Sequence, residues 1–189
     1  KIMKFISYTL PLLFMLSACS STPSHIVVAP DFIQTSQYPI AVSALNLTVE
    51  DSRTSKHLVQ IRKEAQAANL FNSQLPLGNV IEDTLVKALK RKNIQRLEGA
   101  TPSINILVGK ALIDVDQTAF KYQAKTDLSL KATVDTAKGT LTKSYDYKGQ
   151  SEGPLKADIA VLGRDFNQAL TQVLNQILSD QELINFINQ

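Results

Sequence analysis

The sequence has one cysteine, no tryptophan, two histidines and only 6% aromatic residues. A lone cysteine excludes a disulfide within the chain, and a zinc site would need carboxylates as most of its ligands, so we expect no metal and no other cofactor. The scarcity of aromatic rings argues against a surface on which bases or sugars stack. The seven glycines form no phosphate-binding loop, which leaves nucleotide binding without support.

The chain opens with a short apolar segment that ends at its only cysteine. Two lysines accompany the mostly apolar residues 5–16, a run shorter than the about 20 residues that cross a bilayer. The residues directly before Cys19 are Leu16, Ser17 and Ala18. These features are typical of a secretory signal peptide and resemble the lipobox of bacterial lipoproteins, in which the cysteine is acylated. We therefore predict a signal peptide over residues 1–18 and lipidation of Cys19.

The next segment has the composition of a linker. Residues 19–39 contain three prolines and several serines and threonines, which predicts a lipidated cysteine followed by a flexible tether. Residues 40–189 are then of ordinary size for a single domain. Ser20 resembles the residue that lets proteobacterial lipoproteins pass to the outer membrane, so we expect the domain at the periplasmic face of that membrane.

The charge of the mature chain is close to balanced. Cleavage before Cys19 leaves 171 of the 189 residues and removes two lysines, so 18 basic residues remain against 17 acidic ones. The net charge thereby falls from +3 to +1. Because nucleic-acid-binding proteins usually show a clear basic excess, we expect no nucleic-acid partner.

Alternation of apolar and polar residues predicts several strands. Residues 104–115 are partly apolar on both faces, which predicts a central strand. Residues 122–134 alternate between an apolar and a polar face, as a half-solvated antiparallel strand does. A hairpin turn is expected at Lys138–Gly139. The other elements expected from the pattern are strands over 40–49, 57–61 and 141–147, and a loop at 151–154.

Three segments show the apolar spacing of amphipathic helices. The first opens at Gly78 with Asn79 as its N-cap and ends at Lys92, and the others cover residues 158–178 and 181–187. The sum is an α+β domain. We expect a two-layer sandwich in which a mostly antiparallel sheet with a long meander is covered on one face by two helices.

Two groups of polar residues contain residue types used in catalysis. One, within seven residues, has the types of a hydrolytic triad: Asp51, Ser52, Ser55 and His57. Such triads are normally assembled from distant segments, so a turn stabilised by its own side chains explains this group better. Asp114 and Asp116 fit a solvated strand end better than a pair of catalytic carboxylates. We therefore predict no catalytic residues and no enzymatic activity.

Two surfaces fit a binding role. Lys121, Lys125 and Lys131 lie on the polar face of the long strand that includes residues 122–134, a candidate surface for an acidic partner, an anionic lipid or a glycan. Protection of a sheet edge and solubility account for the same lysines. The apolar tail over residues 183–187 is expected to pack as a lid on the sheet, with docking to a partner as the alternative.

With these elements in order, the chain resembles the YajG family of proteobacterial outer-membrane lipoproteins. Besides the lipobox, the resemblance rests on residues 26–30, 51–54, 80–92, 104–116, 122–134, 141–145 and 182–187. Ser52 departs from the family pattern, in which we expect a longer amide side chain. The resemblance implies an outer-membrane lipoprotein of uncharacterised function, so no catalytic residues are carried over.

The sequence favours a non-enzymatic accessory or binding module of the cell envelope. The membrane is reached through the N-terminal lipid, and an envelope protein or peptidoglycan is the expected partner. Two alternatives stay open. One is a lipid or small-molecule carrier with a cavity between helices and sheet, and the other is a cell-wall-directed enzyme whose carboxylates the pattern does not reveal.

Overall fold

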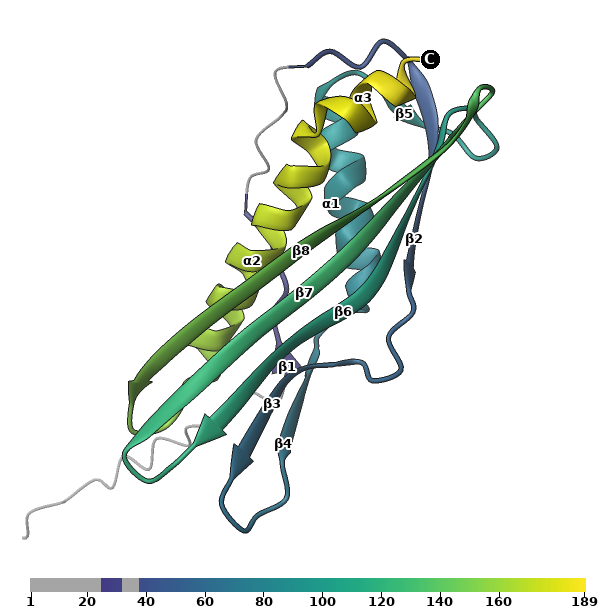
Figure 1. The fold of residues 1–189 in the computed structure, drawn as a ribbon. Coiled ribbons are helices and arrows are strands. Elements are labelled where there is room, and N and C mark those ends of the chain that lie inside the picture. The colour runs from purple at the N-terminus through teal and green to yellow at the C-terminus, as the bar shows by residue number, and fades with distance from the viewer. Residues whose placement is uncertain (1–24, 32–37) are drawn as a thin grey trace, which may run out of the picture.

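A curled, mixed sheet of eight strands carries three helices in the computed structural model, which describes residues 25–31 and 38–189 (Figure 1). The strands are β1 His25–Ile26, β2 Ala44–Asp51, β3 His57–Lys63, β4 Asn69–Ser73, β5 Gln95–Arg96, β6 Ser103–Gln117, β7 Lys121–Thr136 and β8 Gly139–Pro154. The helices are α1 Leu77–Arg91, α2 Ile159–Ser179 and α3 Gln181–Ile187.

Strand β6 organises the sheet. It pairs antiparallel with β7 along its whole length. On its other side, its first half pairs parallel with β2 and its second half pairs parallel with β3, so that β2 and β3 lie end to end. The prediction that this strand is central is therefore confirmed. Because α1 lies between β3 and β6 in the chain, the pairing can be parallel, which a hairpin would not allow.

A β-bulge divides β6 into two parts, in which opposite sets of alternate residues face the helices. The register with β7 shifts between Val108 and Lys110, which leaves Gly109 without a partner residue. The buried residues before the bulge are Ile104, Ile106 and Val108, and those after it are Ala111, Ile113 and Val115. The shift turns both sets toward the helices. The helix-facing side of the strand is apolar, and Leu107 and Leu112 are half-buried on the opposite side, beside Lys131 and Asp127 of β7. The expectation of two partly apolar faces is therefore confirmed, although the bulge itself was not predicted.

Strand β7 follows its alternating pattern. The even-numbered side chains from Tyr122 to Val134 are buried on the helix side, as predicted. The chain turns between Thr136 and Gly139 into β8, which confirms the hairpin. The predicted loop over 151–154 is wrong, because these residues continue β8 and pair with residues 121–124.

The helices cover the apolar face of the sheet. The prediction for α2 is right to within one residue, and Asp158 caps it by accepting a hydrogen bond from the amide of Ala160 at 2.8 Å. The predicted span of α3 is also right. Helix α1 begins at Leu77 with Pro76 as its N-cap residue, so the prediction of Asn79 as the N-cap was wrong.

The α+β class is correct, but the predicted two-layer sandwich on a mostly antiparallel meander is not what the structure shows. The sheet is curled and partly parallel, through the pairings of β6 with β2 and β3 and of β1 with β4. All three predicted helices are present, and all three contact the sheet, where two were expected to cover it. Strand β4, in a segment for which no strand was predicted, pairs antiparallel with β3.

Residues 25–31 pack onto the domain, although they fall within the segment predicted to be a tether. Ile26, 2% exposed, joins the core, and β1 pairs with β4. Asn167 of α2 accepts a hydrogen bond from the amide of Ala29 at 3.0 Å and donates one to the carbonyl oxygen of Val27 at 3.1 Å. The amide of Asp31 donates to the hydroxyl of Thr171. This part of the predicted linker is therefore held by α2 rather than free.

Candidate functional site

The predicted anchor lies outside the described residues. Leu16, Ser17, Ala18 and Cys19 all precede residue 25, where the description begins. Within residues 25–31 and 38–189, no helix combines the length and the apolar character needed to span a membrane. The lipidation of Cys19 thus stays a prediction.

The three predicted surface lysines lie on the face of β7 that the helices leave uncovered. Lys121, Lys125 and Lys131 are all exposed. Ten residues of strand separate the first from the last, a span of about 33 Å at ~3.3 Å per residue. Acidic residues share this face: Asp114 lies beside Lys125, and Asp127 forms an ion pair with Lys110. The lysines are therefore spread over a face of mixed charge rather than gathered into a basic patch.

The residue types of a hydrolytic triad come together as a structural turn. The Arg53 guanidinium donates through Nε to Oδ1 of Asp51 at 2.9 Å and through Nη2 to Oδ2 at 2.8 Å. Its Nη1 donates to the carbonyl oxygen of Ala111 at 2.9 Å. Ser52 donates its hydroxyl hydrogen to the carbonyl oxygen of Val108. The acid and one serine of the group are thus occupied in joining the end of β2 to the middle of β6.

The electrostatics of Asp51 follow from these contacts. Partial burial raises the pKa of its carboxyl group, but the hydrogen bonds and charge of Arg53 outweigh that effect and hold the pKa below its ordinary value. Lys56 adds an ion pair at 3.3 Å. His57 contacts the hydroxyl of Ser55 through Nδ1, on the exposed side of the turn. A charge relay needs an acid that orients the histidine, and Asp51 is instead bonded to Arg53.

The second predicted acidic pair is also part of an ion-pair arrangement. Arg62 of β3 contacts Asp114 at 2.7 Å and Asp116 at 3.0 Å on the uncovered face. Parallel pairing places Arg62 opposite Asp116, which explains why one arginine reaches both carboxylates. Across residues 25–31 and 38–189, His, Cys, Asp and Glu residues form no group of three or more that could hold a metal ion.

A third charged cluster was not predicted. Lys143 of β8 contacts the carboxylates of Asp180 at 2.6 Å and Glu182 at 2.9 Å, and the Tyr145 hydroxyl donates to Asp180 at 2.9 Å. The two carboxylates raise the pKa of Lys143. Burial and, to a lesser extent, Asp180 raise that of Tyr145. Asp180 also caps α3 through the amide of Leu183, so the cluster fastens the α2–α3 corner to β8.

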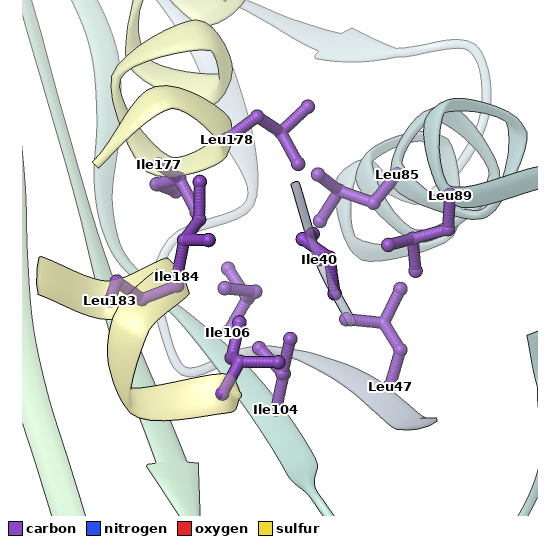
Figure 2. Close-up of a pocket in the computed structure, with 11 residues that line it drawn as sticks. Ile40, Leu47, Leu85, Leu89, Ile104, Ile106, Ile177, Leu178, Leu183 and Ile184 are labelled. Carbon is purple, nitrogen blue, oxygen red and sulfur yellow. The ribbon is translucent and has the colours of Figure 1, made fainter. Parts of the chain in front are cut away.

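An apolar pocket lies between the three helices and the sheet (Figure 2). Its lining comes from every layer of the fold: Ile40, Leu47, Leu85, Leu89, Ile104, Ile106, Ile177, Leu178, Leu183, Ile184 and Ile187. The free space is about 30 Å³, room for about two water molecules. Leu183, Ile184 and Ile187 are buried, so α3 packs as the predicted lid and its apolar face is not free for docking.

The chain is similar to known bacterial lipoproteins over most of its length. The family model described as uncharacterized lipoprotein matches residues 31–188. The chain belongs to this family. Two relatives are each 26% identical over 98% of this chain and 97% of their own length. Both are named uncharacterized lipoprotein YajG, one from Escherichia coli K12 and one from Escherichia coli O6:H1. The membership predicted from the sequence is confirmed.

A solved structure shares the fold. The crystal structure of a protein from Xanthomonas campestris matches with a TM-score of 0.60 and covers 87% of this chain and 97% of its own. The two sequences are 15% identical, so the likeness shows the fold alone.

Some of the residues missed by sequence reasoning had left a signal. Lys143 occupies an inward-facing position of β8, two residues before Tyr145. A lysine at such a position indicates a carboxylate partner, since a charge that is turned inward needs one. Asn167, by contrast, lies on the polar side of α2, and nothing local distinguishes it from its polar neighbours.

Proposed function

We propose that the chain is a lipid-anchored, non-enzymatic module of the bacterial cell envelope, held through Cys19 at the periplasmic face of the outer membrane. The supporting observation is how the fold uses its charged residues. Arg53 and Arg62 bind the acids that a catalytic interpretation would need, Asp51 in the first case and Asp114 with Asp116 in the second. Membership of a family of lipoproteins supports the anchor.

Membrane fractionation tests the anchor and its location. We expect the wild-type chain to sediment with the outer membrane of a Gram-negative host and the Cys19→Ala variant to be found in neither membrane. Ser20→Asp is the matched variant, because an aspartate at that position favours retention at the inner membrane in proteobacterial sorting. Recovery of the wild type in the soluble fraction would contradict the proposal.

The uncovered face of β7 is the surface we assign to partner binding. Lys121, Lys125 and Lys131 have no ion-pair partner within the part of the chain that the structure describes. Replacing all three by glutamine should reduce crosslinking to an envelope protein or to peptidoglycan. The same change at Lys138, in the β7–β8 turn, should leave it intact. Equal crosslinking by both variants would remove this assignment.

The apolar pocket supports a second candidate function, that of a carrier of a lipid or another small molecule. Its lining is entirely apolar, but a free space of about 30 Å³ holds no acyl chain unless α3 moves. Organic extraction of the purified protein, followed by mass spectrometry, tests this. A stoichiometric lipid would favour the carrier, and an extract without lipid would leave the pocket as a packing gap.

A further inference from the structure

Two large apolar side chains are exposed next to each other at one end of the sheet. Phe120, in the turn between β6 and β7, is 83% exposed, and Leu155, directly after β8, is 64% exposed. The amide of Leu155 donates to the carbonyl oxygen of Phe120 at 2.7 Å, which holds the two residues together. Leu155 has a φ of +64°, a conformation that a residue of its size rarely adopts. Strain of this kind clusters where function requires it.

The pair belongs to an end of the molecule that we call the proximal end, made of residues 64–68, 118–120 and 155–156. Register places these segments together. Lys63 is paired with Gln117, and Lys121 is paired with Pro154, so the β3–β4 turn, the β6–β7 turn and the end of β8 lie at the same end of the sheet (Figure 1).

The N-terminal strand enters the fold from this end. Strand β1 runs parallel to β4, which leads away from the β3–β4 turn, and His25 pairs with Asn72, three residues after β4 begins. His25 follows Cys19 by six residues, and an extended chain spans at most about 3.6 Å per residue, so His25 lies within about 22 Å of an anchored Cys19. The hydrogen bond that Asn167 donates to Val27 and the one that it accepts from Ala29 keep this short connection from lengthening.

We infer that Phe120 and Leu155 insert into the lipid surface on which Cys19 is anchored, so that the proximal end faces the membrane. This inference rests on the lipid anchor of the proposed function. Lys121 and Lys156 flank the pair and are exposed, so their stems can lie along the interface with the ammonium groups among lipid phosphates. Glu152 and Asp158 are also nearby and exposed. The two lysines and the two acidic residues nearly cancel in charge. The contact with the membrane therefore depends mainly on the two apolar side chains.

A bilayer fits this feature better than a protein partner does. The short chain between Cys19 and His25 keeps the domain close to the membrane, so even a weak insertion of the proximal end is populated as an intramolecular event. Aromatic and aliphatic side chains at the tip of a loop enter the headgroup region in the manner of other interfacial anchors. The result is a fixed orientation in which the opposite end, where β2 begins, points away from the membrane.

The absence of tryptophan and the single cysteine allow a direct test. The chain from Cys19 onward is coupled through that thiol to maleimide lipid in vesicles of phosphatidylethanolamine and phosphatidylglycerol. Phe120→Trp then supplies the only tryptophan. Leu97→Trp is the matched control, since Leu97 is 58% exposed and bonds through its amide to Leu45, near the start of β2 at the opposite end.

We expect the emission of the Phe120→Trp chain to move to shorter wavelengths on coupling and to be quenched when brominated lipid is included, with no change for Leu97→Trp. Emission that stays unchanged at position 120, or quenching at position 97 instead, would overturn the inference. A shift at position 120 that grows with protein density and is insensitive to brominated lipid would indicate contact between copies, which also overturns it. Because chemical coupling replaces acylation, failure here is separate from failure of the proposed anchor, which membrane fractionation reports.

Discussion

The guanidinium of Arg53 donates a hydrogen bond to the carbonyl oxygen of Ala111, 58 residues away, at a distance of 2.9 Å. The same group forms a two-pronged pair with Asp51, and the arginine is 8% exposed. This contact closes the place on one side of β6 where β2 has ended and β3 has not begun. Arg53 thereby bridges the gap between two short strands that share one long neighbour.

Arg53→Ala should lower the free energy of unfolding by about 3 kcal/mol, because it leaves the Asp51 carboxylate without its main partner in a low-dielectric setting. Chemical denaturation measures the change. The control is Lys56→Ala, which removes a mostly exposed partner of the same carboxylate and should cost less than about 1 kcal/mol. Equal losses in the two variants would show that Arg53 has no special role in the sheet.

The Asp180 cluster should make stability depend on pH. Partial burial raises the pKa of Asp180, but hydrogen bonds from Lys143, the Leu183 amide and Tyr145 outweigh it, so the pKa is lower in the folded state. Its contribution is therefore present above the unfolded value of about 3.9 and is lost as pH falls through the folded value. The raised pKa of Lys143 has the opposite sign. Its contribution is present below about pH 10.4 and is lost as pH rises through the folded value.

Asp180→Asn removes one carboxylate charge from the cluster while keeping a residue that caps α3 well. It should lower the stability at neutral pH by about 1.5 kcal/mol and flatten both the acid and the alkaline limbs of the profile. Denaturation midpoints measured across the pH range check this. Asp146→Asn, an exposed change on the outer face of β8, should leave the profile as it is. A profile with the wild-type slopes in Asp180→Asn would refute the assignment.

Deletion of Gly109 should prevent folding. Without the bulge, residues 110–117 would turn their apolar side chains to the uncovered face, because a shift of one residue inverts the two faces of a strand. Gly109→Ala is the control, since a Cβ there would approach the Ser129 carbonyl oxygen no closer than 3.8 Å. Circular dichroism and the yield of soluble protein distinguish the outcomes. A deletion variant with wild-type stability would show that the bulge does not set the phase of β6.

Asn167→Ala should release the N-terminal segment from α2. Two hydrogen bonds are lost, so we expect a stability change of about 1–2 kcal/mol and faster hydrogen exchange at the amide of Ala29. Gln168→Ala, at an exposed position of the same helix, should change neither. Unaltered protection of Ala29 would mean that β1 pairing alone holds the segment.

Local patterns predicted the elements whose neighbours are close in sequence. Helix α2 was recognised by its apolar spacing and the adjacent Asp158, and the β7–β8 hairpin by alternation and a tight turn. The parallel pairings of β2 and β3 with β6 join residues far apart in the chain, and no local pattern encodes them. The bulge was visible in part, since the apolar residues of β6 change from even to odd positions at Gly109. The same residues predicted two partly apolar faces, and Leu107 and Leu112 do lie on the uncovered face, but the shift of one residue was not predicted.

In the candidate site, too, local contacts were predicted from the sequence and long-range contacts were not. A turn at Asp51–Ser52–Arg53 was predicted from side-chain hydrogen bonding, and the Arg53 amide does donate to Asp51 at 3.1 Å. The reach of the same arginine to Ala111 depends on the tertiary fold and had no local signal. Phe120 and Leu155 are 35 residues apart in the sequence. That they form one exposed apolar pair depends on the pairing of β7 with β8, which brings the two segments together.

The intact mass of the protein purified from membranes of a Gram-negative host is the most direct test of the central claim, that Cys19 carries the anchor. We predict the mass of residues 19–189 plus a diacylglyceryl group and an amide-linked acyl chain, lost on substitution of Cys19 by alanine. A wild-type mass that matches the bare polypeptide, cleaved or uncleaved, would contradict the account.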